Sequence, residues 1–534
     1  MNNRRVFIFF LGVLFFFNSV FAGTTGKLSG SVTNKETGEP LIGANVMVEG
    51  TVLGAATDIE GNYFILQVPP GTYTVRFTMI GYQTVVMNDV RIRVDLTTTL
   101  DGRLSESAVG LEEVIVQAER PMIQTDVTYS QANISSEEVD MLPVEEFEDV
   151  LALQAGVVST GGEIHVRGGR GGEISYMVDG ITVTDPYNSG MAVEIENNAI
   201  QELQFISGTF NAEYGQAMSG IVNIVTKDGD FSKYSGSLSG SFGDYYISSN
   251  RVSFSNSSYP LFPQVDNLNL DNITDLKGNF EGPIVPGVLS FFVSARKNVN
   301  NGYLFGEQIF YPNSYLWSDA QNMFRIDSAV GLGNDDFLLQ DSLWSPTDYQ
   351  DSLFVYIDSL RNNDQFDWVS MNTSDQLTYQ AKLSWRVTPT IKFGYNRMFS
   401  NTKSQDYSHG YRWNPNGRPF SFNTRTGDII RTDISINQST FANIMFSNAV
   451  NHYRTHLSSD PDFYKVIENL SFDDSFWGFD TLDPSSASDY NTDPRIFDYA
   501  TGNNYEVGGN YMDIYNRKSI VRTIKGELTS QYNK

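Results

Sequence analysis

A two-residue alternation of apolar and polar side chains in the second half of the chain most constrains its fold. From Leu377 to Val387 every second residue is apolar, and the residues between them are polar or charged. This spacing gives a strand one apolar and one polar face, and its length matches a tilted transmembrane strand of roughly 9–11 residues. The same pattern follows the turn Thr388–Thr390 and occurs earlier at Tyr234–Phe242 and Leu289–Arg296.

Two architectures fit this pattern, a soluble β-sandwich and a transmembrane antiparallel β-barrel. The connections differ in length: Thr388–Thr390 is tight, whereas Asn298–Asp375 and Ser447–Asn516 are long, polar and rich in Asp, Asn and Tyr. Short turns on one rim and long loops on the other are typical of outer-membrane barrels, so residues 231–534 are predicted to be the N-terminal part of such a barrel. The sequence ends inside what resembles another strand, at 519–534, and we therefore expect a truncated barrel.

The first 22 residues are predicted to be a secretory signal peptide. Arg4 and Arg5 precede the apolar run Val6–Phe17, and small residues lead to Ala22. The alternative is a membrane anchor, but the apolar run is shorter than the roughly 20 residues that a spanning helix needs. The chain has no cysteine, which excludes disulfides and a lipoprotein anchor. Its net charge of −27 argues against nucleic acid as a partner.

Residues 26–104 are predicted to form a small β-sandwich. Short alternating runs are separated by turn residues, with Val46 and Val48 in one run and Tyr73, Val75 and Phe77 in another. The runs "GSVTNKETGEPLIGANVMVEGT" and "TDIEGNYFILQVPPGTYTV" resemble the carboxypeptidase-regulatory-like domain, a transthyretin-like sandwich that is not catalytic. His165, the nearest histidine, lacks the glutamate spacing of a zinc-peptidase site.

Residues 111–229 combine a short strand, helices and a glycine-rich stretch. A strand is predicted within 111–119, a helix start at Ser135–Glu138, and an amphipathic helix that carries Phe147, Val150 and Leu151 and ends near Gly156. The stretch "EIHVRGGRGGEISYMVDGITVTDP" at 163–186 packs glycines around two arginines, which predicts tightly bent strands.

This segment resembles the plug domain of TonB-dependent outer-membrane receptors. The motifs are "VRGG", "YMVDGI" and "IQELQFISGTFNAEYGQAMSGIVNIVTK", in that order. The predicted structural motif of the plug consists of Arg167, Gly168, Gly169, Arg170, Asp179, Gly180, Gly215, Gly220 and Asn223. The predicted fold class is therefore mainly β: an N-terminal β-sandwich, an α+β plug domain and a truncated transmembrane antiparallel β-barrel.

The resemblance implies a receptor that binds a scarce nutrient at the cell surface and imports it to the periplasm, without enzyme activity or cofactor. A TonB-type energy-transducing protein would pull on a TonB box, for which the candidate residues are Glu112, Glu113, Val114, Ile115 and Val116. The alternative is that this strand is a linker or the first strand of the plug. The substrate is a small molecule, oligosaccharide or peptide. A SusD-like lipoprotein partner is disfavoured, because "VIVQAERPM" lacks the glycine-tyrosine-rich box of the SusC-type subgroup.

The other chemical motifs are weaker. His452 and His456 are four residues apart, but their sequence context indicates a polar loop rather than a metal site, and Asn334–Phe337 lacks the spacing of a calcium loop. Arg167 and Arg170 either pair with carboxylates such as Glu163 or Glu173, or with the barrel wall, to hold the plug, or they exchange partners during transport. The rival functions are a surface adhesin or carbohydrate-binding protein and a secreted all-β enzyme.

Overall fold

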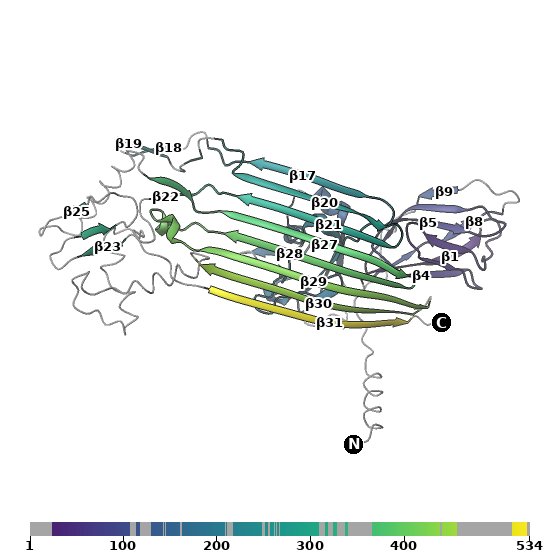
Figure 1. Cartoon of the computed structure of the whole chain (residues 1–534). Helices are drawn as coiled ribbons and strands as arrows, with labels where there is room; N and C mark the ends of the chain where they lie inside the picture. The colour runs from purple at the N-terminus through teal and green to yellow at the C-terminus, as the bar shows by residue number, and fades with distance from the viewer. Residues whose placement is uncertain are drawn as a thin grey trace, which may run out of the picture.

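The structure is a computed structural model in which three bodies, a sandwich, a plug and a long curved sheet, lie against one another (Figure 1). It describes residues 24–106, 114–117, 130–308, 315–318, 324–327, 337–339, 366–437, 440–456 and 515–530, apart from positions 143, 145, 161–162, 209, 211–216, 248–250, 255–256, 261, 263 and 266–267. The predicted signal peptide lies outside the described residues. No helix among the described residues has the length and apolarity to cross a membrane.

The N-terminal body is a β-sandwich, as predicted. One sheet has the strand order β4-β1-β7, with β8 also paired to β1, and the other has the order β3-β2-β5-β6-β9. Val46, Val48, Val75 and Phe77 are fully buried between the sheets, so the predicted alternation is confirmed. The strand bounds are β1 Gly26–Asn34, β2 Asn45–Val48, β3 Gly54–Ala56, β4 Asn62–Val68, β5 Gly71–Thr78, β6 Val85–Ile92, β7 Thr97–Thr99, β8 Gly102–Leu104 and β9 Val114–Gln117.

The second body, the plug, is a mixed sheet with two short helices. Its sheet has the order β10-β15-β16-β13-β14, and β11 and β12 form a separate hairpin. Helix α2 begins after Ser135, whose side chain accepts from the Glu138 amide while Glu138 accepts from the Ser135 amide, a reciprocal cap that stabilises this helix start. The bounds are β10 Ser130–Ser135, α2 Ser136–Met141, α3 Phe147–Ala152, β11 Val157–Thr160, β12 Glu163–Val166, η1 Gly171–Glu173, β13 Ile174–Val178, β14 Ile181–Thr182, η2 Asn197–Ala199, β15 Ile200–Ser207 and β16 Gly220–Thr226.

The third body is an eight-stranded antiparallel sheet in which each strand pairs with the next in the order β17-β20-β21-β27-β28-β29-β30-β31. Its strands are β17 Ser235–Gly243, β20 Ile273–Val285, β21 Leu289–Asn300, β27 Ser374–Thr388, β28 Ile391–Ser404, β29 Phe420–Asn437, β30 Thr440–His456 and β31 Tyr515–Ser530. The connections at 286–288, 389–390 and 438–439 are short, and they alternate with longer ones at the opposite end. This alternation is typical of outer-membrane barrels.

The longer connections carry the remaining strands and short helices. These are β18 Arg251–Phe254, β19 Ser257–Pro260, β22 Phe305–Gln308, β23 Tyr315–Ser318, β24 Phe324–Asp327, β25 Phe337–Leu339, β26 Asp367–Ser370, η3 His409–Tyr411 and η4 Pro415–Gly417. The interpretation of the residues around His452 and His456 as a loop is wrong, because β30 extends to His456. A polar run at a sheet face that does not contact lipid has the composition of a loop, which explains this error.

The two faces of the eight-stranded sheet differ in polarity. Its inner face carries many small or polar residues that are buried: Ser290, Ser294, Thr378, Gln380, Ser384, Asn396, Ser400, Asn443, Ser447 and Asn451. Its outer face exposes large apolar residues, among them Leu276, Phe280, Val293, Leu383, Trp385, Ile430, Ile444, Ile520, Ile524 and Leu528. An exposed apolar band with a polar interior is the pattern of a transmembrane β-sheet, and it confirms the predicted fold class.

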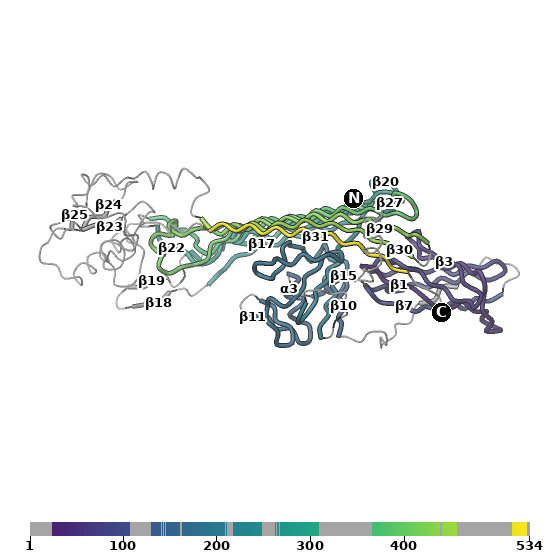
Figure 2. The backbone as a smooth tube through the Cα atoms, turned by 90° about the horizontal axis from the view of Figure 1, so that it is seen from below, coloured from purple at the N-terminus to yellow at the C-terminus, as the bar shows by residue number. Residues whose placement is uncertain are grey.

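The plug lies on the concave inner face of this sheet, and the sandwich lies at the end with the short turns (Figure 2). Five apolar residues on the inner face of the sheet belong to the same buried cluster as the plug core: Phe292, Met398, Ile429, Met445 and Ala449. The plug and the wall therefore share one continuous apolar contact, which is flanked by the polar contacts described next.

Candidate functional site: the contact between plug and barrel wall

The Asp179–Gly180 turn is the part of the plug that reaches the wall. Val178 and Ile181 pair across β13 and β14, which leaves Asp179 and Gly180 as a two-residue hairpin loop. Both have positive φ, 49° for Asp179 and 82° for Gly180. A hairpin turn with positive φ at both central residues favours Asp-Gly, so the motif sequence explains the local geometry.

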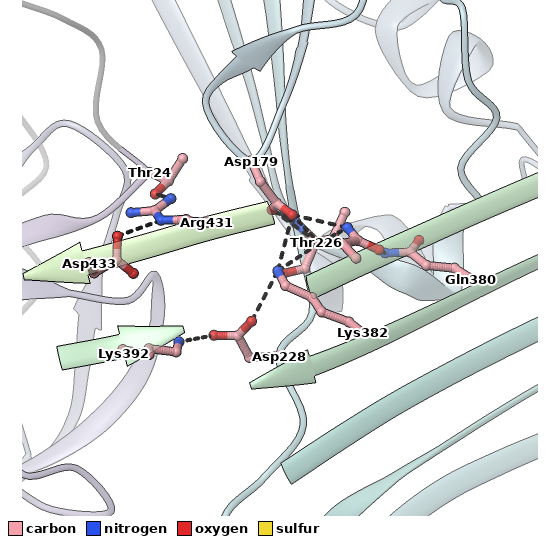
Figure 3. Close-up of polar contacts among 10 residues, drawn as sticks. Thr24, Asp179, Thr226, Asp228, Gln380, Lys382, Lys392, Arg431 and Asp433 are labelled. Atoms are coloured by element: carbon pink, nitrogen blue, oxygen red, sulfur yellow. Dashed lines mark hydrogen bonds and ion pairs between the residues drawn. The ribbon is translucent and has the colours of Figure 1, made fainter. Parts of the chain in front are cut away.

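The Asp179 carboxylate is buried and fully engaged by hydrogen bonds (Figure 3). It accepts from the Thr226 amide at 2.9 Å and from the Thr226 hydroxyl at 2.8 Å, both on the neighbouring plug strand β16. From the wall it accepts from Asn396 Nδ2 at 3.1 Å and from Lys382 Nζ at 3.2 Å. One plug carboxylate is therefore bound by both its own domain and two adjacent wall strands, β27 and β28.

Lys382 of the wall binds three residues, Asp179 and Thr226 of the plug and Asp228, which follows β16. Its ammonium contacts Asp179, the Thr226 hydroxyl at 2.8 Å and Asp228 Oδ1 at 3.0 Å. Lys392 binds the other oxygen of Asp228 (Figure 3). Burial alone would raise the pKa of Asp228, but the ammonium groups of Lys382 and Lys392 hold the pKa of this carboxyl well below its usual range. Asp228 is therefore ionised, and we call the set Asp179, Thr226, Asp228, Lys382, Lys392 and Asn396 the lysine lock.

A second polar contact lies on the loop between β14 and η2. Glu194 accepts from Arg425 Nη1 at 2.8 Å and from Gln376 Nε2 at 2.8 Å, and both donors belong to the wall. Next to it, Arg296 of the wall pairs with Glu196 of the plug at 3.4 Å and with Asp275 of the neighbouring strand at 2.7 Å. The plug is thus acidic where the wall is basic, and this complementarity fixes its position on the sheet.

A third contact is steric. Gly427 on β29 has no side chain where Val193 of the plug approaches, and a Cβ built there would lie 2.6 Å from Val193 Cγ1. Asn451 of β30 donates to the buried Asp185 carboxylate of the same plug loop at 2.9 Å. Lys525 of β31 donates to the Gly180 carbonyl at 3.0 Å, so the turn is held from both sides.

The predicted plug motif is only partly brought together at this contact. Asp179 and Gly180 belong to the lysine lock. A Cβ on Gly220 would lie 3.2 Å from Val166 and 3.5 Å from Phe205 inside the plug. Asn223 donates to Gln204 of the adjacent strand at 3.0 Å. Gly215 lies outside the described residues.

The two arginines of the motif occupy a bend of the plug. Arg167 has φ 50°, and its amide donates to the Gly156 carbonyl at 2.7 Å. Around the bend, Gly168 has φ 79° and a Cβ on Gly169 would clash with Ser219. The Arg170 amide donates to Glu173 at 3.2 Å. Among the described residues neither guanidinium forms an ion pair with the wall, so the arginines' role in holding the gate stays a prediction.

Sequence reasoning missed Lys382, Lys392, Arg425 and Glu194. The first two are basic residues on the polar face of strands whose other inward positions are mostly small or uncharged, and that contrast is the signal that could have found them. Among the described residues no group of three or more His, Cys, Asp or Glu side chains could hold a metal ion.

The candidate TonB-box strand lies in a sheet of the sandwich, which differs from both alternatives, a linker and the first strand of the plug. Val114–Gln117 is β9, which pairs in parallel with β6 at the edge of a sandwich sheet. It is therefore neither a free linker nor a strand of the plug sheet in this structure. Glu112 and Glu113 lie outside the described residues.

A plug held by buried charges against the polar face of a transmembrane β-sheet defines a plugged outer-membrane β-barrel protein. The family model of the CarboxypepD_reg-like domain matches residues 28–116, and that of the TonB-dependent receptor plug domain matches residues 123–222. The chain thus carries a TonB-dependent receptor plug domain behind a carboxypeptidase-regulatory-like domain.

Curated relatives bear the same description. The chain is 25% identical to the TonB-dependent transporter Oar of Myxococcus xanthus over 74% of this chain and 35% of the relative. It is 29% identical to the TonB-dependent receptor SusC of Bacteroides thetaiotaomicron over 37% of this chain and 21% of the relative. The siderophore receptor PirA of Pseudomonas aeruginosa aligns over 61% of this chain and 45% of that chain, with a TM-score of 0.32 and 16% identity. The chain spans about a third or less of the length of these two curated relatives.

Proposed function

We propose that the chain is the sandwich, plug and first barrel strands of an outer-membrane receptor that imports a scarce nutrient to the periplasm. The observation that carries the proposal is the lysine lock, in which plug carboxylates are neutralised by lysines on the inner face of a transmembrane sheet. A wide barrel needs such a plug to keep the membrane sealed.

The energy for that movement would come from a TonB-type protein that pairs with β9. The strand is at the edge of its sheet, so one of its backbone edges has no partner strand in the described sheet order. An exposed strand edge recruits an extended partner through main-chain hydrogen bonds. A pull on β9 would then be transmitted along the chain toward the plug.

The substrate would enter from the end with the long connections, opposite the sandwich. Relatives in this family include SusC, but the SusC-type glycine-tyrosine-rich box is missing after residue 113, which argues against an obligatory SusD-like lipoprotein partner. Export through a signal peptide at 1–22 is part of the proposal.

Two measurements on the full-length protein test this function. Fractionation should recover it with the outer membrane, and the purified receptor should bind the periplasmic domain of a TonB-type protein. Val114→Pro should abolish that binding, because proline cannot donate to a strand ladder. The matched control is Val52→Pro, in an exposed loop of the same sandwich. A soluble periplasmic protein, or one that binds no TonB-type domain, would favour an adhesin or a carbohydrate-binding protein instead.

A further inference from the structure

The sandwich is attached to the plug through the end of β6 and the segment that follows it. Arg91 forms a two-pronged ion pair with Glu138 at the start of α2, with contacts of 3.3 and 3.2 Å. Three residues later, the Val94 amide donates to Glu202 Oε2 at 3.2 Å. Glu202 is buried, and its other oxygen accepts from Asn133 of the plug. Glu138 of α2 and Glu202 of β15 thus bind the same edge of the sandwich, at Arg91 and Val94.

The sandwich is also attached to the barrel wall. Gln67 donates to Asn443 of β30 at 3.3 Å and accepts from Ser435 of β29 at 3.1 Å. Arg431 of β29 hydrogen-bonds the Thr24 hydroxyl and pairs with Asp433 of its own strand (Figure 3). The sandwich therefore lies across the boundary between plug and wall, at the end where the plug would have to open.

The strand that holds β9 is the same strand that holds the plug. β9 pairs with β6 from Val85↔Val114 to Asn88↔Gln117, and β6 then runs on to Arg91. Because the pairing is parallel, both strands run in the same direction toward that attachment. A force applied to β9 therefore loads β6 and its attachment to Glu138, as well as the chain that continues from β9 to β10 of the plug.

We propose that the carboxypeptidase-regulatory-like domain is a latch on the periplasmic exit, released only when a partner strand bound to β9 pulls on β6 and the sandwich leaves the plug and wall. The inference rests on the proposed import function and adds an ordered step to it. The sandwich moves first and the lysine lock opens second. The contacts that break first are those of Arg91, Val94 and Gln67, which are fewer than those of the lysine lock, and the Arg91–Glu138 pair among them is partly exposed to solvent.

The order of events is tested by pulling the full-length receptor in a lipid nanodisc with an immobilised TonB-type periplasmic domain. The chain has no cysteine, so Gln67→Cys/Ser435→Cys can be joined by a short reducible bis-methanethiosulfonate. We expect the force of the first extension event to at least double when this pair is joined and to return to the wild-type value after reduction. The matched control, Asn45→Cys/Ala56→Cys, joins β2 to β3 inside the sandwich and should leave the force of the first extension event at the wild-type value.

An unchanged first event in the joined Gln67/Ser435 protein would overturn the latch while leaving import intact. If the immobilised TonB-type domain does not bind the receptor at all, the import function is overturned, and the latch with it. A second measurement does not depend on the partner: nitroxides at Glu60→Cys and Ile436→Cys should give one narrow distance distribution at rest. It should broaden in Arg91→Ala but not in Arg103→Ala, an exposed arginine of β8. A broad distribution in the wild type would show that the sandwich is not seated, and would also overturn the latch.

Discussion

Replacing Lys382 by methionine should release the plug from the wall more than any other single substitution in the lysine lock. Lys382 contacts Asp179, Thr226 and Asp228, and methionine keeps most of its volume while removing the charge. Removing one partner of a buried ion pair costs roughly 3–5 kcal/mol, because the remaining charge is left without its counterion. Asp179 keeps the donors Thr226 and Asn396, and Asp228 keeps Lys392, so we expect the lower end, about 3 kcal/mol.

The assay is urea titration of the full-length receptor in detergent, with plug release followed by the reactivity of a single cysteine at Ser294. This residue of the wall strand β21 is buried and donates to Asn198 of the plug, so it becomes exposed when the plug leaves the wall. A loss of about 3 kcal/mol corresponds to a roughly hundredfold rise in the exposed population at fixed urea. Lys518→Met, an exposed lysine on β31, is the matched control and should lie within about 0.5 kcal/mol of the wild type.

A double-mutant cycle measures the coupling between Asp179 and Lys382 directly. Asp179→Asn and Lys382→Met should be strongly non-additive, since each removes the same ion pair. If their effects add, or if Lys382→Met and Lys518→Met behave alike, the lock does not hold the plug.

Three further predictions concern other contacts. Burial raises the pKa of Glu202 to about 7, although hydrogen bonds from the Val94 amide and Asn133 favour its ionised form. Because this pKa is above its unfolded value, the Glu202 carboxyl binds a proton more tightly in the folded state than in the unfolded state. The melting temperature of the sandwich–plug unit should therefore fall as pH rises from about 4.5 to 7, and Glu202→Gln should flatten this fall; an identical slope in both proteins would contradict it. Gly427→Ala should destabilise plug docking by about 1–3 kcal/mol in the urea assay because of the Val193 clash, whereas Gly526→Ala, which meets no atom, should have no such effect. Gly180→Ala should cost about 1 kcal/mol in the same assay because of its φ of 82°, and a neutral result would show that the turn rearranges freely.

The large sheet and the sandwich were predictable because their signal is local. Alternation at 377–387 assigns each side chain to one face of its strand, and the structure buries Thr378, Gln380 and Ser384 while it exposes Leu383 and Trp385. The cap at Ser135 and the Asp179–Gly180 turn were likewise encoded within a few residues.

The lysine lock and the position of β9 were not predictable in this way. Asp179 and Lys382 are 203 positions apart, and nothing in the sequence near either residue indicates its partner. Arg167 and Arg170 stand out in the sequence because they lie among glycines, whereas Lys382 is one polar residue in an ordinary alternating strand. The pairing of β9 with β6 depends on which sheet edge is open, a property of the assembled sandwich and not of the strand sequence.

The most direct test of the account is a probe scan along β27 of the full-length receptor in outer-membrane vesicles. Single cysteines at each position from 377 to 387 would carry a bimane, with a nitroxide lipid as quencher. The account predicts quenching with a period of two, strong at Leu377, Leu383 and Trp385 and weak at Thr378, Gln380 and Ser384. Uniformly weak quenching, or the opposite phase, would contradict a transmembrane sheet that holds its plug on the polar face.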